Sequence, residues 1–171
     1  DINDSAQSIY YPSIGTKMTG KGGAKIISKA KNVSLVDTVK YENLIMGHSY
    51  TVRGVLMDKK TGKPYEEDGK DVVGSTTFTS KGNGTAPVSF KLNTSKIAGK
   101  ELVAYEKVYN EKGQLVATHE DINNRDQTIR VTQPIIPRTG DGSLLYMYLG
   151  LFLTSFVALA SLTVIKRCVR L

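Results

Sequence analysis

The sequence predicts an all-β protein, a β-sandwich followed by a C-terminal transmembrane helix. Short stretches rich in Val, Thr and Tyr recur between turns of Gly, Asn and Lys, a pattern typical of all-β sandwiches. Near the end of the 171-residue chain, residues 144–165 form an uncharged apolar run. A helix needs about 20 apolar residues to cross a bilayer, so this run is long enough.

The predicted strands follow one another from residue 24 to residue 132. Alternation is clearest in residues 49–57, where Tyr50, Val52 and Leu56 share one face. The other predicted strands are 24–27, 34–41, 71–80, 85–92, 101–108, 115–117 and 127–132. The predicted turns are 43–47, 58–62 and 111–113, and residues 93–99 are the one stretch expected to form a helical turn. Residues 12–23 contain Gly, Pro, Ser and Lys without a period, which indicates a linker.

The ends of the chain predict a wider organisation. Residues 1–9 match residues 121–129 at five of nine positions, which suggests tandem repeats interrupted at the start of this sequence. With no secretory signal at residue 1, we expect a C-terminal fragment of a longer protein. The predicted parts are 1–14, the end of a preceding repeat and a linker; 15–132, the sandwich; 133–143, a proline-rich stalk; 144–165, the transmembrane helix; and 166–171, a basic cytoplasmic tail.

Composition argues against several classes of function. The net charge is +7, but the lysines are scattered and no basic patch is interleaved with aromatic residues, so we expect no nucleic-acid partner. Two histidines and a single cysteine, Cys168 in the tail, give no metal-ligand spacing. We therefore expect neither a metal nor another cofactor, and no disulfide in the predicted sandwich.

The segment before the apolar run resembles the sortase signal of Gram-positive surface proteins, Leu-Pro-x-Thr-Gly. Its residues are Ile136, Pro137, Arg138, Thr139 and Gly140. The pentapeptide, the apolar run and the basic tail follow in the order of that signal. The resemblance implies that a sortase cuts after Thr139 and passes its carboxyl group to an amine of peptidoglycan or of a pilin. It also implies a membrane-held precursor and a product covalently anchored to the cell wall on the extracellular side.

The predicted sandwich resembles the VaFE repeats of Gram-positive adhesins and pilins, and through them the ester-bond domains. The motifs that carry the resemblance are Val103-Ala104-Tyr105-Glu106, Val36-Asp37-Thr38-Val39, Gly54-Val55-Leu56-Met57-Asp58, Val116-Ala117-x-His119 and Gln127-Thr128. The resemblance implies an Ig-like or CnaB-like sandwich over about residues 15–132. In such domains a threonine of the first strand is joined to a glutamine of the last strand.

Residue chemistry assigns roles for that ester. Thr38 is the expected nucleophile, and the side-chain amide of Gln127 is the expected acyl group, releasing ammonia. Because an unassisted hydroxyl attacks an amide slowly, a base must take its proton. His119 is the expected base, Glu106 is expected to orient or polarise, and Asp58 to share in this.

One position departs from the family pattern. Five residues after the histidine the family often carries an acid, whereas this chain has Asn124. If that acid shares a proton with Glu106, the crosslink here is expected to form more slowly.

The resulting prediction is a structural stalk module, not an enzyme, that holds absent tip domains with a possible host ligand away from the cell wall. Three alternatives stay open. A pilin-like domain would carry a Lys–Asn isopeptide bond catalysed by Glu106, with Lys25 or Lys40 as candidates. A surface hydrolase would use His119 and Glu106. A ligand-binding adhesin domain is the third.

Overall fold

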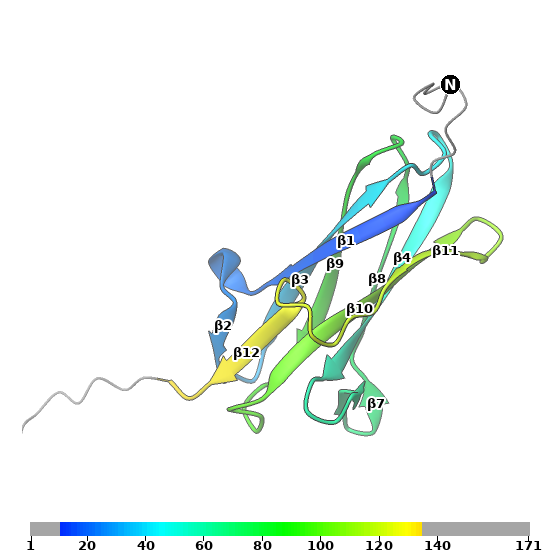
Figure 1. Cartoon of the computed structure of the whole chain (residues 1–171). Coiled ribbons are helices and arrows are strands. Elements are labelled where there is room, and N and C mark those ends of the chain that lie inside the picture. The colour runs from blue at the N-terminus through cyan, green and yellow to red at the C-terminus, as the bar shows by residue number, and fades with distance from the viewer. Residues whose placement is uncertain (1–10, 135–171) are drawn as a thin grey trace, which may run out of the picture. The chain divides into compact units, whose positions relative to one another are not determined.

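The computed structural model describes residues 11–134, and these residues form β-strands with no α-helix (Figure 1). The all-β prediction is confirmed for this part of the chain. Its strands make two large sheets and one small two-stranded sheet, and buried apolar residues from both large sheets form one shared core. A single turn of 3-10 helix, η2 (Lys21–Gly23), follows the first strand.

The first sheet has the order β1-β3-β9, and both of its pairings are antiparallel. Its strands are β1 (Ser13–Thr19), β3 (Val33–Glu42) and β9 (Gly84–Leu92). Every second residue of β3 and β9 faces the core. This row is apolar except at one place, where β3 carries the buried carboxyl group of Asp37.

The second sheet has the order β2-β12-β10-β4-β5, with β11 along β10 and β8 along β4. The strands are β2 (Ile26–Ser28), β12 (Thr128–Thr132), β10 (Glu101–Asn110), β4 (Ser49–Asp58), β5 (Lys63–Pro64), β11 (Leu115–His119) and β8 (Val73–Thr79). A small hairpin joins β6 (Glu66–Glu67) to β7 (Lys70–Asp71).

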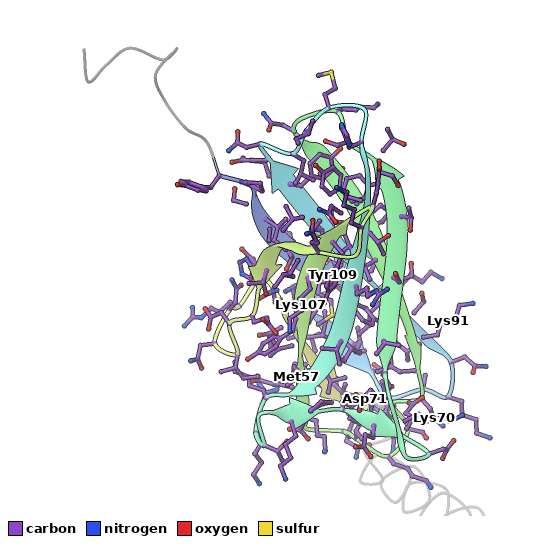
Figure 2. The ribbon with its side chains drawn as sticks, turned by 90° about the vertical axis from the view of Figure 1, so that its right-hand side faces the viewer. Met57, Lys70, Asp71, Lys91, Lys107 and Tyr109 are labelled. Atoms are coloured by element: carbon purple, nitrogen blue, oxygen red, sulfur yellow. The ribbon has the colours of Figure 1, made fainter. Side chains whose placement is uncertain are left out.

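Along one of its sides, strand β10 pairs with two different strands, one for each half of its length. Its first residues, 101–103, pair with β12, whereas residues 106–109 pair with β11. The segment between β11 and β12 leaves the sheet and returns at this point. On the outer face of β10, Lys107 and Tyr109 are partly exposed (Figure 2), while Glu106 and Val108, which alternate with them along the strand, are buried.

The first strand lies beside the last part of the domain, although it belongs to the other sheet. In Figure 1 β1 (blue) runs near β12 (yellow) and the segment that precedes it. The backbone N–H of Met18 donates a hydrogen bond to the carbonyl oxygen of Asp126 over 2.8 Å. This hydrogen bond links the first strand to the segment that precedes the last strand.

Most of the predicted strands are confirmed within one to three residues of their ends, but the linker prediction for residues 12–23 is wrong. Residues Ser13–Thr19 form β1, in which Thr16 and Met18 are buried and Lys17 is exposed. The glycines and lysines around this short stretch hide its alternation. The first strand of the domain is therefore β1, which precedes residues 24–27, the first strand that the sequence predicts.

Several sequence predictions fall outside the described residues. These are the repeat at residues 1–9, the sorting segment 136–140, the apolar run 144–165 and the basic tail 166–171. Among residues 11–134, no helix has the length and apolar character to cross a membrane.

Candidate functional site

We call four buried polar side chains in the interior of the sandwich the polar cluster. They are Thr16, Asp37, Glu106 and Gln127. Asp37, Glu106 and Gln127 have no exposed surface, and Thr16 is 8% exposed. Two come from the first sheet, one comes from β10, and Gln127 directly precedes β12. Polar groups of this kind are rarely buried without a structural or chemical reason.

The antiparallel register of β1 and β3 brings Thr16 to Asp37. Met18 pairs with Asp37 and Thr16 pairs with Val39, so Thr16 and Asp37 are diagonal neighbours on the core face. The hydroxyl group of Thr16 lies close enough to the Asp37 carboxyl to influence its pKa. A potential nucleophile and a potential base are thus held side by side.

Gly54 makes room for the carboxyl group of Glu106. The two residues pair across β4 and β10. A Cβ atom at position 54 would lie 2.6 Å from Glu106 Oε2 and 2.6 Å from Phe90 Cζ, closer than packing allows. Glycine within a strand often marks such a close approach. The sequence alone does not reveal this role of Gly54, because the contact depends on the register in which β4 pairs with β10.

The polar cluster is poorly satisfied by hydrogen bonds. Thr16 Oγ1, both carboxyl oxygens of Asp37, both of Glu106 and Gln127 Oε1 are buried without a hydrogen bond of standard geometry. Most buried polar atoms in folded proteins do have such a partner. The exceptions gather here, at one place, which is how a reactive site differs from an ordinary core.

The pKa values of the two carboxyl groups are both raised, and they are raised by different amounts. Burial raises the pKa of Asp37 to about 6, although the Thr16 hydroxyl and Glu106 oppose the rise. Burial, together with the negative charge of Asp37, raises the pKa of Glu106 to about 9. At neutral pH the pair therefore holds one proton, and burial together with the charge of Asp37 favours that proton on Glu106. Such a separation provides one base and one acid.

The side chain of Gln127 has a fixed orientation. Its Nε2 donates to the backbone carbonyl oxygen of His119 over 3.3 Å. The backbone carbonyl oxygen of Gln127 accepts from the N–H of Ala104 over 3.1 Å, which fixes the main chain from which the side chain extends. Because a carbonyl oxygen only accepts, Nε2 must face His119. Oε1 is then the atom left without a partner in the buried interior.

His119 lies at the margin of the polar cluster and is half-buried. It ends β11 opposite Glu106. Its Nδ1 is 3.1 Å from the carbonyl oxygen of Ile14, and its Nε2 is 2.9 Å from Nδ2 of Asn124. Both ring nitrogens therefore have a partner, one on β1 and one in the segment before Gln127.

Lys25 crosses between the same two segments. Its Nζ donates to the carbonyl oxygens of Met18 and Asp126, each over 2.7 Å. Burial lowers the pKa of Lys25, while the nearby charges of Asp126 and Asp37 act in the opposite direction. Lys40, the other lysine considered for an isopeptide bond, is exposed and pairs with Glu42 over 2.7 Å. Neither amine has a hydrogen bond to Glu106.

The structure does not bring Thr38 or Asp58 to the polar cluster, and both assignments are corrected. Thr38 is exposed, because it alternates with buried Asp37 and points to the other face of β3. Asp58 pairs with Leu102, at the far end of β10 from Glu106, and forms an ion pair with Lys100 at 2.5 Å. The carboxyl group of Asp58 therefore contacts a lysine at the sheet edge and does not belong to the buried acid pair.

The other predicted residues are distributed as follows. Glu106 and Gln127 lie in the polar cluster and His119 lies beside it. Thr16, Asp37 and Gly54 are site residues that the sequence does not predict. Lys25, predicted only as a candidate for an isopeptide bond, donates to two backbone carbonyl oxygens. The sorting residues Ile136, Pro137, Arg138, Thr139 and Gly140 lie outside the described residues.

Known proteins with a similar fold include a bacterial adhesin from Mobiluncus mulieris, solved in two crystal forms and described as containing intramolecular disulfide, isopeptide and ester bond cross-links. One form has a TM-score of 0.62 at 17% identity over 72% of this chain and 58% of the adhesin chain. The other has a TM-score of 0.59 at 17% identity over 70% and 56%. This chain thus spans less than two thirds of the adhesin chain, and at this identity the likeness concerns the fold.

No curated protein sequence matches the chain at a significant level. The sequence profile of a domain family does match, and it covers residues 12–131, from the start of β1 to the end of β12. That range contains every residue of the polar cluster. The chain therefore belongs to the family of T-Q ester bond containing domains.

Proposed function

We propose that this domain joins its own first and last strands by an ester between Thr16 Oγ1 and the side-chain carbonyl carbon of Gln127. One observation carries the proposal. A buried hydroxyl and a buried carboxamide share the polar cluster with two carboxyl groups whose pKa values are separated. The family supplies the residue types, one Thr and one Gln. The geometry favours Thr16 over Thr38.

The residues support a simple sequence of proton transfers. Ionised Asp37 takes the hydroxyl proton as Thr16 Oγ1 attacks Cδ of Gln127. Protonated Glu106 hydrogen-bonds to the amide oxygen as negative charge develops there. The C–N bond then breaks, and the proton held by Asp37 passes to the departing nitrogen, which leaves as ammonia. The product has one new C–O bond and both carboxyl groups in their starting states.

The expected rate enhancement has two sources. Fixed contact between a nucleophile and its target is worth effective molarities of about 10⁵–10⁸ M. General acid–base assistance adds about 10²–10⁴-fold. His119, expected from sequence to be the base, has both ring nitrogens engaged. We therefore assign the base to Asp37 and give His119 a role in holding β1. The reaction occurs once per chain, so the domain is structural and is not an enzyme.

The position of the ester suggests what it is for. It links β1 to the residue before β12, so a pulling force that enters near residue 11 and leaves near residue 134 passes through a covalent bond. We propose a stalk module of a bacterial surface adhesin or pilin-like protein, related to VaFE repeats. Its tip domains, with a possible host ligand, lie elsewhere in the protein.

The anchoring half of the proposal rests on the sequence of residues 136–171. The sorting segment, the apolar run and the basic tail support cleavage by a sortase after Thr139 and transfer to peptidoglycan or a pilin amine. Incubation with a Gram-positive sortase and an amine donor is expected to give a product that ends at Thr139. A chain that stays intact, or that is cut elsewhere, contradicts this half and leaves the ester untouched.

Intact mass spectrometry of the 171-residue chain tests the ester. The expected mass is lower than the sequence mass by one ammonia. Thr16→Ala should restore the full mass, and the matched change Thr38→Ala should not. A chain of full mass contradicts the proposal. A loss of ammonia that survives Thr16→Ala but not Lys25→Met favours an isopeptide bond instead.

A further inference from the structure

Asn124 is the centre of the hydrogen bonds that shape the segment between His119 and Gln127. Its Oδ1 accepts from the backbone N–H of Asp126 over 2.8 Å and of Gln127 over 3.3 Å. Because backbone N–H groups only donate, the oxygen of the Asn124 amide must lie on this side. Its NH₂ group therefore points the other way, toward the ring of His119.

The two neighbours of the His119 ring select one tautomer. Asn124 Nδ2, a donor, is 2.9 Å from Nε2, so Nε2 carries a lone pair and no hydrogen. The carbonyl oxygen of Ile14, an acceptor, is 3.1 Å from Nδ1, so Nδ1 carries the hydrogen. The contact with Asn124 excludes a hydrogen on Nε2, and the contact with Ile14 places the single hydrogen of the neutral ring on Nδ1.

This pair of contacts links the two strands that carry the reacting groups. Ile14 is two residues before Thr16, and Asn124 is three residues before Gln127. The ring of His119 joins them, and its backbone carbonyl also holds Nε2 of Gln127. If the ring gained or lost a proton, the hydrogen bonds that it can make to Ile14 on one side and to Asn124 on the other would change.

We propose that Asn124 is a positioning residue that fixes His119 as the neutral Nδ1–H tautomer and thereby holds β1 against Gln127. The inference rests on the proposed ester, but it makes its own claim about an atom outside the polar cluster. The ring acts as a two-sided hydrogen-bonding bridge, and it does not accept the Thr16 proton.

The substitution Asn124→Asp separates two possible roles of Asn124, which are to select the tautomer of His119 and to maintain the conformation of the loop. One carboxylate oxygen of Asn124→Asp still accepts from the N–H groups of Asp126 and Gln127. The other now presents an acceptor to Nε2, where the amide presented a donor. With acceptors at both nitrogens, the ring of His119 should take a second proton while the loop keeps its shape.

The direct test is the ¹⁵N spectrum of the histidine rings in the 171-residue chain. Thr16→Ala keeps the chain unreacted, and His48→Ala removes the signal of the other histidine. We expect a hydrogen-bearing Nδ1 and a lone-pair Nε2 for His119, and two hydrogen-bearing nitrogens when Asn124→Asp is added. Asn123→Asp, which places the same charge on the exposed neighbouring residue, should leave the spectrum unchanged. A proton on Nε2, or no response to Asn124→Asp, overturns the inference.

The rate of ammonia loss supplies the functional readout. It is measured on chains that keep Thr16, after they are refolded from urea. Asn124→Ala removes both sides of the bridge and should slow the loss by roughly 10- to 100-fold, the scale for misplacing reacting groups by about 1 Å. Asn124→Asp should restore part of the rate because it keeps the loop bonds. Equal rates for Asn124→Ala and the unchanged chain overturn the inference. If the unchanged chain loses no ammonia, the ester proposal fails, and the ring spectrum still decides the tautomer.

Discussion

Asp37 and Glu106 approach each other between the two sheets, and each carboxyl group alters the pKa of the other. Asp37 lies on β3 and Glu106 on β10, so the pair forms only when the sandwich has closed. Placing two acids in a dry core is unfavourable for folding. They give the domain an acid and a base in the interior that also holds the buried hydroxyl of Thr16 and the buried amide of Gln127.

The rate of ester formation should have a bell-shaped dependence on pH. Asp37 must be ionised to act as a base, so the rate should rise as pH passes about 6. Glu106 must be protonated, so the rate should fall as pH passes about 9. Chains recovered unfolded and refolded by dilution at each pH can be followed by mass. The range from pH 5 to pH 10 extends about one unit beyond each of the two pKa values. A rate that stays constant over this range would refute the acid–base assignment.

The same pKa values predict how the stability of the unreacted domain depends on pH. Both groups have raised pKa values in the folded state, so the folded protein binds more protons than the unfolded chain above about pH 4, where free carboxyl groups titrate. The free energy of unfolding of Thr16→Ala should therefore fall as pH rises from about 4 toward 9. Adding Glu106→Gln should remove most of this slope in urea titrations. A slope that persists would assign it to other groups.

Substitution of Gly54 tests the space that holds Glu106. A methyl group in Gly54→Ala would meet Glu106 Oε2 and Phe90 Cζ at 2.6 Å, so the carboxyl group must move. We expect slower ammonia loss by about 10²-fold and a lower free energy of unfolding by about 1–3 kcal/mol. Gly15→Ala is the control, since no atom lies within 4 Å of its added Cβ. Equal effects of the two substitutions would contradict this role.

Lys25 is predicted to hold β1 against the segment before β12. Lys25→Met removes two charge-assisted hydrogen bonds, to the carbonyl oxygens of Met18 and Asp126. The expected loss of unfolding free energy is about 1.5–3 kcal/mol, together with slower crosslinking. Lys17→Met, at an exposed neighbouring site on β1, should change neither. The prediction fails if both lysine variants behave alike.

The ester itself should contribute measurably to stability. It closes the chain between residues 16 and 127, and a covalent link over a loop of this size is worth about 4–5 kcal/mol in the loop-entropy description. Thr16→Ala should lower the free energy of unfolding by that amount, and Thr38→Ala by less than about 1 kcal/mol. Urea unfolding of the two variants measures the difference. Similar values would mean that the link is absent or does not constrain the unfolded chain.

Much of the fold and part of the site could be predicted from the sequence, because they depend on local pattern. Strand alternation predicts β3, β4, β9 and β10, and the Val103–Glu106 motif places an acid in an apolar strand. Gln127 and His119 lie in short motifs that a resemblance can detect.

Two features of the sequence bear on the prediction of Thr38 as the nucleophile. The composition of residues 12–23 is typical of a linker and hides β1, so Thr16 falls outside the predicted strands. Asp37 shares its phase with Leu35, Val39 and Tyr41, which are apolar, whereas Thr38 shares its phase with Lys40. Alternation alone therefore places Asp37 inside and Thr38 outside.

The roles that Gly54, Lys25 and Asn124 have in the folded domain depend on contacts that the sequence does not show, although Lys25 and Asn124 are singled out in it. Gly54 and Lys25 act through residues far away in the chain, and Asn124 acts through the path of one loop. Gly54 meets Glu106 through the register of β4 with β10. Lys25 reaches Asp126 across 101 positions of the chain. Such contacts are properties of the assembled sandwich.

The most direct test of the central claim is to locate the crosslink by tandem mass spectrometry of the digested 171-residue chain. The account predicts a branched peptide in which the Thr16 hydroxyl is joined to Gln127, absent from Thr16→Ala and present in Thr38→Ala. A branch at Thr38, a branch at any lysine, or separate unmodified peptides that contain Thr16 and Gln127 would contradict it.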